Sequence, residues 1–323
     1  MRLSLLDRSR TRIGLPDAEA LTGSVERAVA VERLGYDRFW VAEHHAVPGI
    51  ASGAPAVLLA AVGAATSTIR FGSGGVMLPN HQPLVVAEQF LTLAALHPGR
   101  VDLGVGRSLG FTAPVRAALR HDVDAPDTFE QDLLELRDLL DGSADVTARP
   151  AVAGGVPMAL LATGRGVPIA ARLGLPLVVG GPMLRSDAGL ESLGAYRRDY
   201  RPSALAPDPH VTVSLDVLVA DDDEAARTLA LPEAWAMARS RREGQFPPLE
   251  PIEAIRAQPW PDQVRRRIDD HLAGVVAGSP ATVRAALDDL RRRTGADELL
   301  ASSSTHDRDA LARSDALLRD VVA

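Results

Sequence analysis

A glutamate and two histidines come directly after the second apolar segment of this chain. Glu43, His44 and His45 follow residues 37–41, which have the composition of a short buried strand. Side chains alternate in direction along an extended backbone, so His44 and His45 are expected to point to opposite sides. An imidazole can act as a general acid or base near neutral pH. The sequence therefore predicts at least one functional histidine here, with a buried structural hydrogen-bond network as the alternative.

A zinc-dependent hydrolase is a second alternative, because barrels can hold zinc with histidines from strand ends. Two histidines on opposite sides of the backbone do not share one ion, and the other histidines show no two-apart or four-apart pairing. The chain contains no cysteine, which excludes thiolate nucleophiles, disulfides and cysteine-bound metal centres. From the histidine spacing and the absence of cysteine we predict no metal site.

The chain also contains no lysine, which excludes a P-loop lysine and a Schiff-base lysine.

Glycines end two further strand-like segments. Gly72-Ser-Gly-Gly75 ends the third, where glycine permits the close approach of a flat ligand or forms a β-bulge. The fourth ends in Gly106-Arg107, which places a guanidinium where it can meet an anionic group. Both motifs are compatible with a cofactor that lies across strand ends.

The turn Ala162-Thr-Gly-Arg-Gly166 follows the fifth strand-like segment and opens a helix. Backbone N–H groups and the helix dipole at such a turn favour a phosphate, and Thr163 adds a hydroxyl. A plain connecting turn fits this motif about as well. Taken with the glycines, the arginine and the histidines, the turn predicts a phosphorylated planar cofactor at the strand ends.

The elements that must position these residues alternate between strand and helix from end to end. The predicted strands are short apolar segments at 3–6, 37–41, 69–76, 101–105, 157–161, 175–179, 211–219 and 298–302. Eight strands, each followed by a helix, predict a (β/α)8 TIM barrel with its active face at the carboxyl ends of the strands. Residues 241–273 are rich in proline and charge and interrupt this rhythm before the last βα unit. We therefore expect 1–323 to be a single domain with an insertion, a lid candidate, over the active face.

Charge and hydropathy exclude two classes of partner. The net charge of −7 argues against nucleic acid, which needs a basic face. The longest run of small and apolar residues, 54–65, is shorter than the roughly 20 residues of a membrane span, and we predict a buried helix there. The N-terminus reaches acidic residues too early for a signal peptide, so a cytoplasmic location is expected.

Several motifs together resemble the bacterial luciferase-like monooxygenase family. They are Phe39-Trp-Val-Ala-Glu-His-His45, Gly72-Ser-Gly-Gly-Val-Met-Leu-Pro79, Pro83 with Ala87-Glu88, Pro98-Gly-Arg-Val-Asp-Leu-Gly-Val-Gly-Arg107, and the shorter pieces 172–176, 278–280, 294–298 and 304–307. The last piece resembles actinobacterial members. The resemblance covers nearly the whole chain and implies a (β/α)8 barrel, commonly a homodimer through helices flanking strands two and three. It also implies binding of reduced FMN or, in another branch, a reduced deazaflavin.

The resemblance further implies how the flavin ring would be held. A non-proline cis peptide between Gly74 and Gly75 would lie beneath the ring. His44 would face the flavin near the position where oxygen adds, as the catalytic residue, and Glu43 would lie beside the ring edge.

Phosphate and substrate positions follow from the same resemblance. Arg107, Thr163 and the backbone of Gly164 would hold the phosphate. Luciferase has a glutamate and a threonine in this turn where the present chain has Ala162 and Gly166, so backbone N–H groups would carry more of the binding. Substrate-pocket candidates are Asn80, His81 and Gly181, the last of which stands where luciferase has a tryptophan.

The implied reaction is oxygenation of a small organic substrate. Reduced FMN from a separate flavin reductase would react with O2 to give a C4a-(hydro)peroxyflavin in a water-poor cavity, with His44 as general acid or base. One alternative is a deazaflavin-dependent dehydrogenase on the same fold, which transfers hydride without activating oxygen. Another is a non-catalytic flavin-binding protein of the same ancestry. No residue marks a particular substrate.

Overall fold

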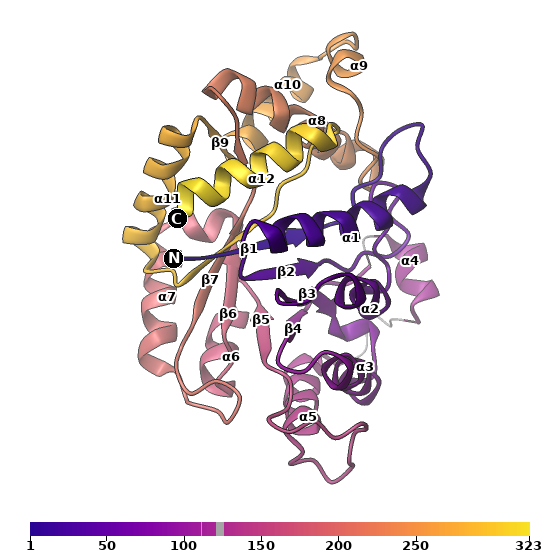
Figure 1. Ribbon diagram of the computed structural model, residues 1–323, viewed down its shortest axis with the longest axis vertical. Coiled ribbons are helices and arrows are strands. Elements are labelled where there is room, and N and C mark those ends of the chain that lie inside the picture. The colour runs from indigo at the N-terminus through magenta and orange to yellow at the C-terminus, as the bar shows by residue number, and fades with distance from the viewer. Residues whose placement is uncertain (111, 121–125) are drawn as a thin grey trace.

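The computed structural model describes residues 1–110, 112–120 and 126–323 and contains a closed barrel of eight parallel strands (Figure 1). Around the barrel the strands follow the order β1-β10-β7-β6-β5-β4-β3-β2. They are β1 (Arg2–Asp7), β2 (Arg38–Val41), β3 (Arg70–Met77), β4 (Val101–Gly106), β5 (Met158–Leu161), β6 (Leu177–Gly180), β7 (Val211–Leu215) and β10 (Glu298–Ala301). The predicted TIM barrel is confirmed.

Helices surround the barrel and connect its strands (Figure 1). The α-helices are α1 (Asp17–Arg33), α2 (Pro55–Ala65), α3 (Pro83–Leu96), α4 (Ala113–Ala118), α5 (Phe129–Asp141), α6 (Gly166–Leu173), α7 (Asp187–Asp199), α8 (Asp223–Glu243), α9 (Ile252–Arg256), α10 (Asp262–Leu272), α11 (Pro280–Thr294) and α12 (Arg308–Val322). Two 3-10 helices are η1 (Leu78–Asn80) and η2 (Gly181–Arg185). None of the helices in the described ranges is long and apolar enough to cross a membrane.

Neighbouring residues on one strand contribute to two apolar layers. Phe39 on β2 is fully buried in the large cluster between the strands and the helices. The next residue, Trp40, belongs to a smaller cluster with Leu6 and Leu300. Successive side chains of a strand point to opposite faces, so this second cluster fills the barrel interior. Because both faces are buried, the strands read as continuous apolar runs rather than as alternating ones.

The segment 211–219 is two strands, and its prediction as a single barrel strand is wrong. The barrel keeps β7, whereas β8 (Val217–Val219) pairs with β9 (Val276–Gly278) in a separate two-stranded sheet. The break falls at Asp216, whose carboxylate is 3.2 Å from Arg8 Nη2 and whose carbonyl accepts from the backbone N–H of Val276. An ion pair and a backbone hydrogen bond to β9 thus mark the break between β7 and β8. Neither contact can be recognised from the apolar periodicity of the sequence.

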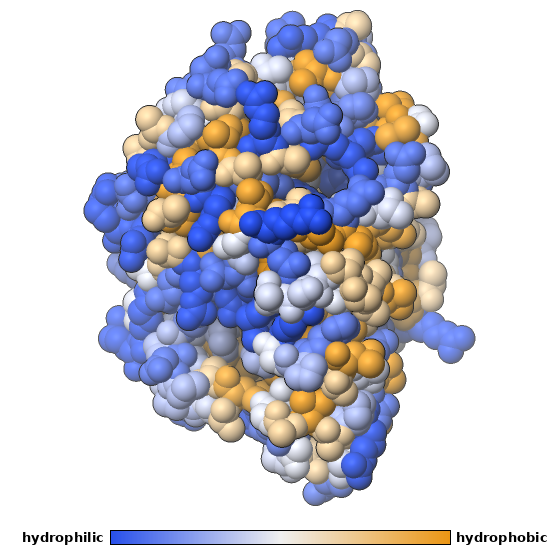
Figure 2. Space-filling model, viewed as in Figure 1, coloured by the Kyte–Doolittle hydropathy of each residue, from blue (hydrophilic) through white to orange (hydrophobic). Residues whose placement is uncertain are grey.

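Residues 241–273 form the end of α8, then α9 and α10, which pack on α8. Trp235, Ile255 and Ile268 make a small apolar cluster separate from the main core, with Trp260 packed against it. The Trp235 and Trp260 rings stack with their centroids 6.0 Å apart. Residues 241–273 thus pack on α8 through an apolar cluster that is separate from the main core. On the face of the molecule drawn in Figure 2, hydrophilic and apolar residues are intermixed, and a hollow opens between α12 and α1.

Candidate functional site

The predicted site residues lie after five strands that are neighbours in the barrel. Since β2, β3, β4, β5 and β6 are consecutive around the closed sheet and parallel, their carboxyl ends form one arc of the same mouth. Glu43, His44 and His45 follow β2; Gly74 and Gly75 lie in β3, with Asn80 and His81 just after it; Arg107 follows β4; Thr163 and Gly164 follow β5; Gly181 follows β6.

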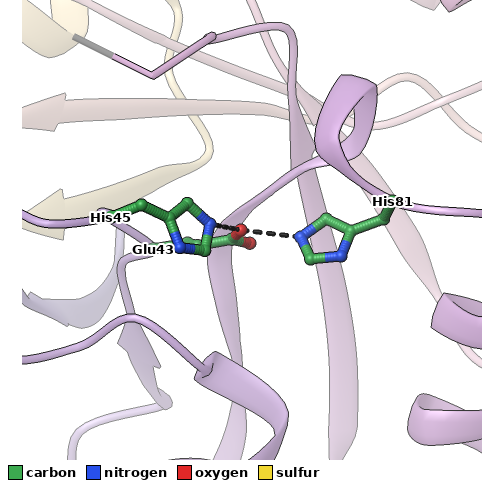
Figure 3. A group of neighbouring side chains, drawn as sticks. All are labelled: Glu43, His45 and His81. Atoms are coloured by element: carbon green, nitrogen blue, oxygen red, sulfur yellow. Dashed lines mark hydrogen bonds and ion pairs between the residues drawn. The ribbon is translucent and has the colours of Figure 1, made fainter. Parts of the chain in front are cut away.

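Glu43 is the centre of a hydrogen-bonded network at this arc (Figure 3). Its side chain is completely buried, and its Oε1 lies 2.6 Å from Nε2 of His45 and 2.6 Å from Nε2 of His81. The other oxygen accepts the backbone N–H of Met77 at 3.0 Å. Figure 3 shows the two imidazoles on either side of the carboxylate. The sequence could not pair His81 with Glu43, because only the barrel brings the ends of β2 and β3 together.

The network keeps the carboxylate ionised. Burial alone would raise the pKa of Glu43, but hydrogen bonds from His45, His81 and the Met77 N–H lower it to about 2. An ionised carboxylate only accepts hydrogen bonds, so each imidazole donates its Nε2–H to it. In a neutral ring this leaves Nδ1 as the atom that can accept a proton.

The same three side chains form a group of metal-ligand type, with ligand atoms within 4.8 Å of one another. Sequence spacing does not reveal this group, because His81 is distant from Glu43 along the chain and only the fold brings the two side chains together. In the structure one carboxylate oxygen accepts from both rings, so the group is held together as a hydrogen-bonded unit.

His44 has different neighbours from His45. Burial, and then the positive charges of Arg8 and Arg10, lower the pKa of His44 to about 4. The imidazole is therefore neutral at pH 7, below the near-neutral titration that the sequence led us to expect. Arg8 and Arg10 follow β1, and sequence reasoning did not include them in the site. Two arginines directly after a barrel strand were the available signal.

The Gly74–Gly75 peptide bond is cis, as the resemblance implied. A register shift between Ser73 and Val76 also places a bulge here, so the β-bulge interpretation of these glycines holds as well. A Cβ on Gly75 would lie 2.8 Å from the carbonyl oxygen of Gly104 on β4. The barrel wall itself therefore requires glycine at position 75.

Of the two predicted phosphate-binding groups, Arg107 already has a side-chain ion-pair partner and the turn at Thr163 is exposed. Arg107 forms an ion pair with Asp127, and its guanidinium lies 5.8 Å from the centroid of the Phe129 ring. Thr163 and Gly164 are exposed in the turn before α6, where the carbonyl of Thr163 accepts from Gly166 N. A phosphate at this turn would share Arg107 with Asp127.

Open space at three strand ends fits a flat ligand. A Cβ added to Gly106, Gly164 or Gly181 would meet nothing within 4 Å, and these glycines follow or end the adjacent strands β4, β5 and β6. The amide nitrogen and oxygen of Asn80 are both buried without a hydrogen-bond partner in the described part of the chain. An unused donor beside an unused acceptor matches a ligand whose edge carries both.

Gly181 lines a cavity of about 1140 Å³ that extends from the mouth toward the insertion. Ser214 and Ser302 contribute from the ends of β7 and β10, and Arg267 and His271 contribute from α10. The insertion thus borders the side of the mouth opposite the Glu43 network, where a substrate pocket was expected.

Comparison with known proteins identifies the family. The profile described as "Luciferase-like monooxygenase" matches residues 1–298. A luciferase-like monooxygenase of Escherichia coli K12 is 36% identical over 325 residues, covering 98% of this chain and 96% of the relative. The crystal structure of apo-MsnO8 has a TM-score of 0.88 at 35% identity and covers 99% of this chain and 98% of its own. The oxygenating constituent of 3,6-diketocamphane monooxygenase from Pseudomonas putida, in complex with FMN, shares the fold at 20% identity, with a TM-score of 0.76 and coverage of 100% and 98%. The chain therefore belongs to the luciferase-like monooxygenase family and is an oxidoreductase of that family.

Proposed function

We propose that the protein is a flavin-dependent monooxygenase that uses reduced FMN and O2 to oxygenate a small organic substrate. The observation that carries this proposal is the composition of one arc of the barrel mouth. Strand ends open at Gly106, Gly164 and Gly181 lie on the same arc as His44, whose pKa is lowered, and as the imidazoles hydrogen-bonded to Glu43. The flavin, when bound, supplies the oxygen activation, and the protein binds it, orients it and excludes water.

The residues around the arc divide the binding of the cofactor. Arg107 and Thr163, with the backbone of Gly164, would hold the phosphate. Gly74 and Gly75 would lie under the ring, where the absence of side chains allows a close approach. The unpartnered Asn80 amide supports a polar contact with the ring edge or with the substrate.

Proton handling falls to the histidines. His44 is neutral at pH 7 and so can accept a proton at the reacting centre, which supports its assignment as the catalytic residue. Glu43 fixes the orientation of His45 and His81 through their Nε2 atoms and leaves Nδ1 of each as the acceptor. Residues 241–273 would limit water access as a lid over the adjacent cavity.

The proposal includes partners. Reduced FMN would come from a separate flavin reductase in the cytoplasm. The protein would act as a homodimer through α2 and α3, and support for this comes from the exposed apolar side chains of Val57 on α2 and Val85 and Leu96 on α3.

Anaerobic titration with reduced FMN, followed by admission of air, tests the proposed function. We expect one FMN per chain and oxygen consumption that depends on the protein. Arg107→Gln should weaken FMN binding about tenfold or more, because a charge-assisted contact with the phosphate is lost. Arg172→Gln is the matched control, since Arg172 is a comparably exposed arginine paired with Glu130 on α5.

The competing functions give different results in the same experiment. Binding of a reduced deazaflavin without binding of FMN would identify a dehydrogenase. Binding of FMN with no effect on oxygen consumption in any substrate screen would identify a non-catalytic flavin carrier.

A further inference from the structure

A second cavity, of about 320 Å³, lies away from the arc of predicted site residues. It is enclosed by α1, α12 and the loops that follow β1 and β10, and none of the predicted site residues lines it. Helices α1 and α12 run side by side in Figure 1, and Figure 2 shows the hollow between them. Its volume is within the range of small-molecule pockets.

The carboxylates deep in this cavity are already neutralised. Arg27 lies 2.8 Å from Asp315 Oδ1 and 3.1 Å from Asp7 Oδ2, so one guanidinium bridges the two acids. Near the surface, Arg308 lies 3.5 Å from Glu26 and donates to the carbonyl of Glu19. These contacts account for the acids that face the cavity from β1 and for most of those from the helices.

Arg12 is a cation without a carboxylate partner in the described residues. Its Nε donates to the carbonyl of His306 at 2.7 Å and its Nη2 to that of Thr305 at 3.2 Å. Burial, and then the nearby charge of Arg308, lower the pKa of Arg12 to about 10, so the guanidinium remains charged at pH 7. Arg12 is a partly buried charge whose side-chain hydrogen bonds go to carbonyl groups and which lies near other arginines, so a further counter-ion would stabilise it.

Two hydroxyls beside Arg12 are unused. Ser304, which is only 8% exposed, lines the cavity and makes no hydrogen bond with any described residue. Thr305 is fully buried, and its Oγ1 has no partner within the same part of the chain. The cavity wall also contains an apolar side, to which Val31, Leu34 and Leu311 contribute. The lining thus combines a cationic, hydroxyl-bearing end with an apolar wall.

We propose that this cavity binds a small organic anion, with its carboxylate at Arg12 and Ser304 and its apolar body between α1 and α12. The site is separate from the barrel mouth and does not depend on the proposed flavin chemistry. A carboxylate supplies the counter-charge that Arg12 lacks and an acceptor for the Ser304 hydroxyl. The apolar body would cover the exposed or partly exposed apolar side chains of Ala30, Leu34 and Ala312 at the two helices.

Calorimetric titration of the flavin-free protein with hexanoate tests the site. We expect one hexanoate per chain, and at least tenfold weaker binding of hexanamide, which lacks the charge, and of acetate, which lacks the chain. Arg12→Gln should weaken hexanoate at least tenfold and leave the weak binding of hexanamide unchanged. Arg313→Gln is the matched control, because Arg313 lies on α12 but does not line this cavity.

Ala312→Trp provides a test that does not remove a polar contact. Ala312 lines the cavity but is exposed on α12, so a tryptophan there would extend into the cavity without disturbing the packing of the core. It should abolish hexanoate binding while the thermal unfolding temperature stays near that of the parent. Equal affinity for hexanoate and hexanamide, unchanged binding in Ala312→Trp, or hexanoate bound elsewhere in a soaked crystal would each overturn the proposal.

Discussion

A single carboxylate orients two imidazoles at the mouth of this barrel. Glu43 can do so because it is buried and yet remains ionised, with hydrogen bonds from His45 and His81 outweighing the cost of burial. Sequence analysis identified the Glu-His-His cluster but assigned Glu43 to the cofactor and His81 to the substrate pocket. It could not show their mutual contact, which depends on how β2 and β3 pair.

Removing the charge of Glu43 should destabilise the fold. Glu43→Gln weakens three hydrogen bonds to an ionised acceptor, and we expect a loss of about 2–4 kcal/mol in the free energy of unfolding. Urea unfolding measures this, and nitrogen NMR should show that His45 and His81 no longer keep a fixed Nε2–H tautomer. Glu130→Gln, at an exposed ion pair, should change stability by less than about 0.5 kcal/mol. Equal stability of the two variants would contradict the network.

The lowered pKa of His44 predicts a pH dependence with a defined sign. The pKa is about 4 in the folded state and about 6.5 in an unfolded chain, so between these values the unfolded state binds more protons. Stability is therefore complete above pH 6.5 and falls as the pH drops toward 4, by about 3 kcal/mol. The difference between the urea midpoints at pH 7 and pH 4.5 should be smaller in His44→Gln than in the parent protein. Parallel pH profiles of the two proteins would show that His44 does not titrate in this way.

At the scale of elements, apolar patterning predicted the barrel because each strand is buried on both faces. It failed at 211–219, where the Asp216–Arg8 ion pair ends β7 and β8 joins another sheet. Apolar periodicity continues through this break, so the pattern contains no signal for it. Arg8 and Arg10 were missed for a related reason, since their effect on His44 depends on the packing of the loop after β1.

Two glycines in neighbouring strands should respond differently to alanine. In Gly75→Ala the new Cβ would lie 2.8 Å from the carbonyl oxygen of Gly104, and we expect destabilisation of about 1–3 kcal/mol. In Gly106→Ala the Cβ would meet no atom within 4 Å, so stability should change by less than about 0.5 kcal/mol. The methyl group at 106 should instead weaken binding of reduced FMN several-fold, as measured by anaerobic titration. Unchanged FMN affinity in Gly106→Ala would place the cofactor away from this strand end.

At the scale of the whole molecule, the loop after β1 lies between the barrel mouth and the cavity between α1 and α12. Arg8 and Arg10 act electrostatically on His44 at the mouth, and both also line the cavity between α1 and α12. The insertion contacts this loop through Leu249, whose carbonyl accepts from Ile13 N and whose N–H donates to the carbonyl of Thr11. The barrel mouth, the insertion and the cavity between α1 and α12 therefore all contact the loop after β1.

The flank formed by α2 and α3 carries exposed apolar side chains, from which we predict the oligomeric state. Val57, Val85 and Leu96 are 74%, 49% and 66% exposed, and burying such side chains in a two-fold interface would stabilise a homodimer. Sedimentation equilibrium should give twice the chain mass for the parent protein and the mass of one chain for Val57→Arg combined with Leu96→Arg. Val146→Arg, at an exposed valine outside this flank, should remain dimeric. A monomeric parent would refute the dimer, and a dimeric double variant would move the interface to another face of the barrel.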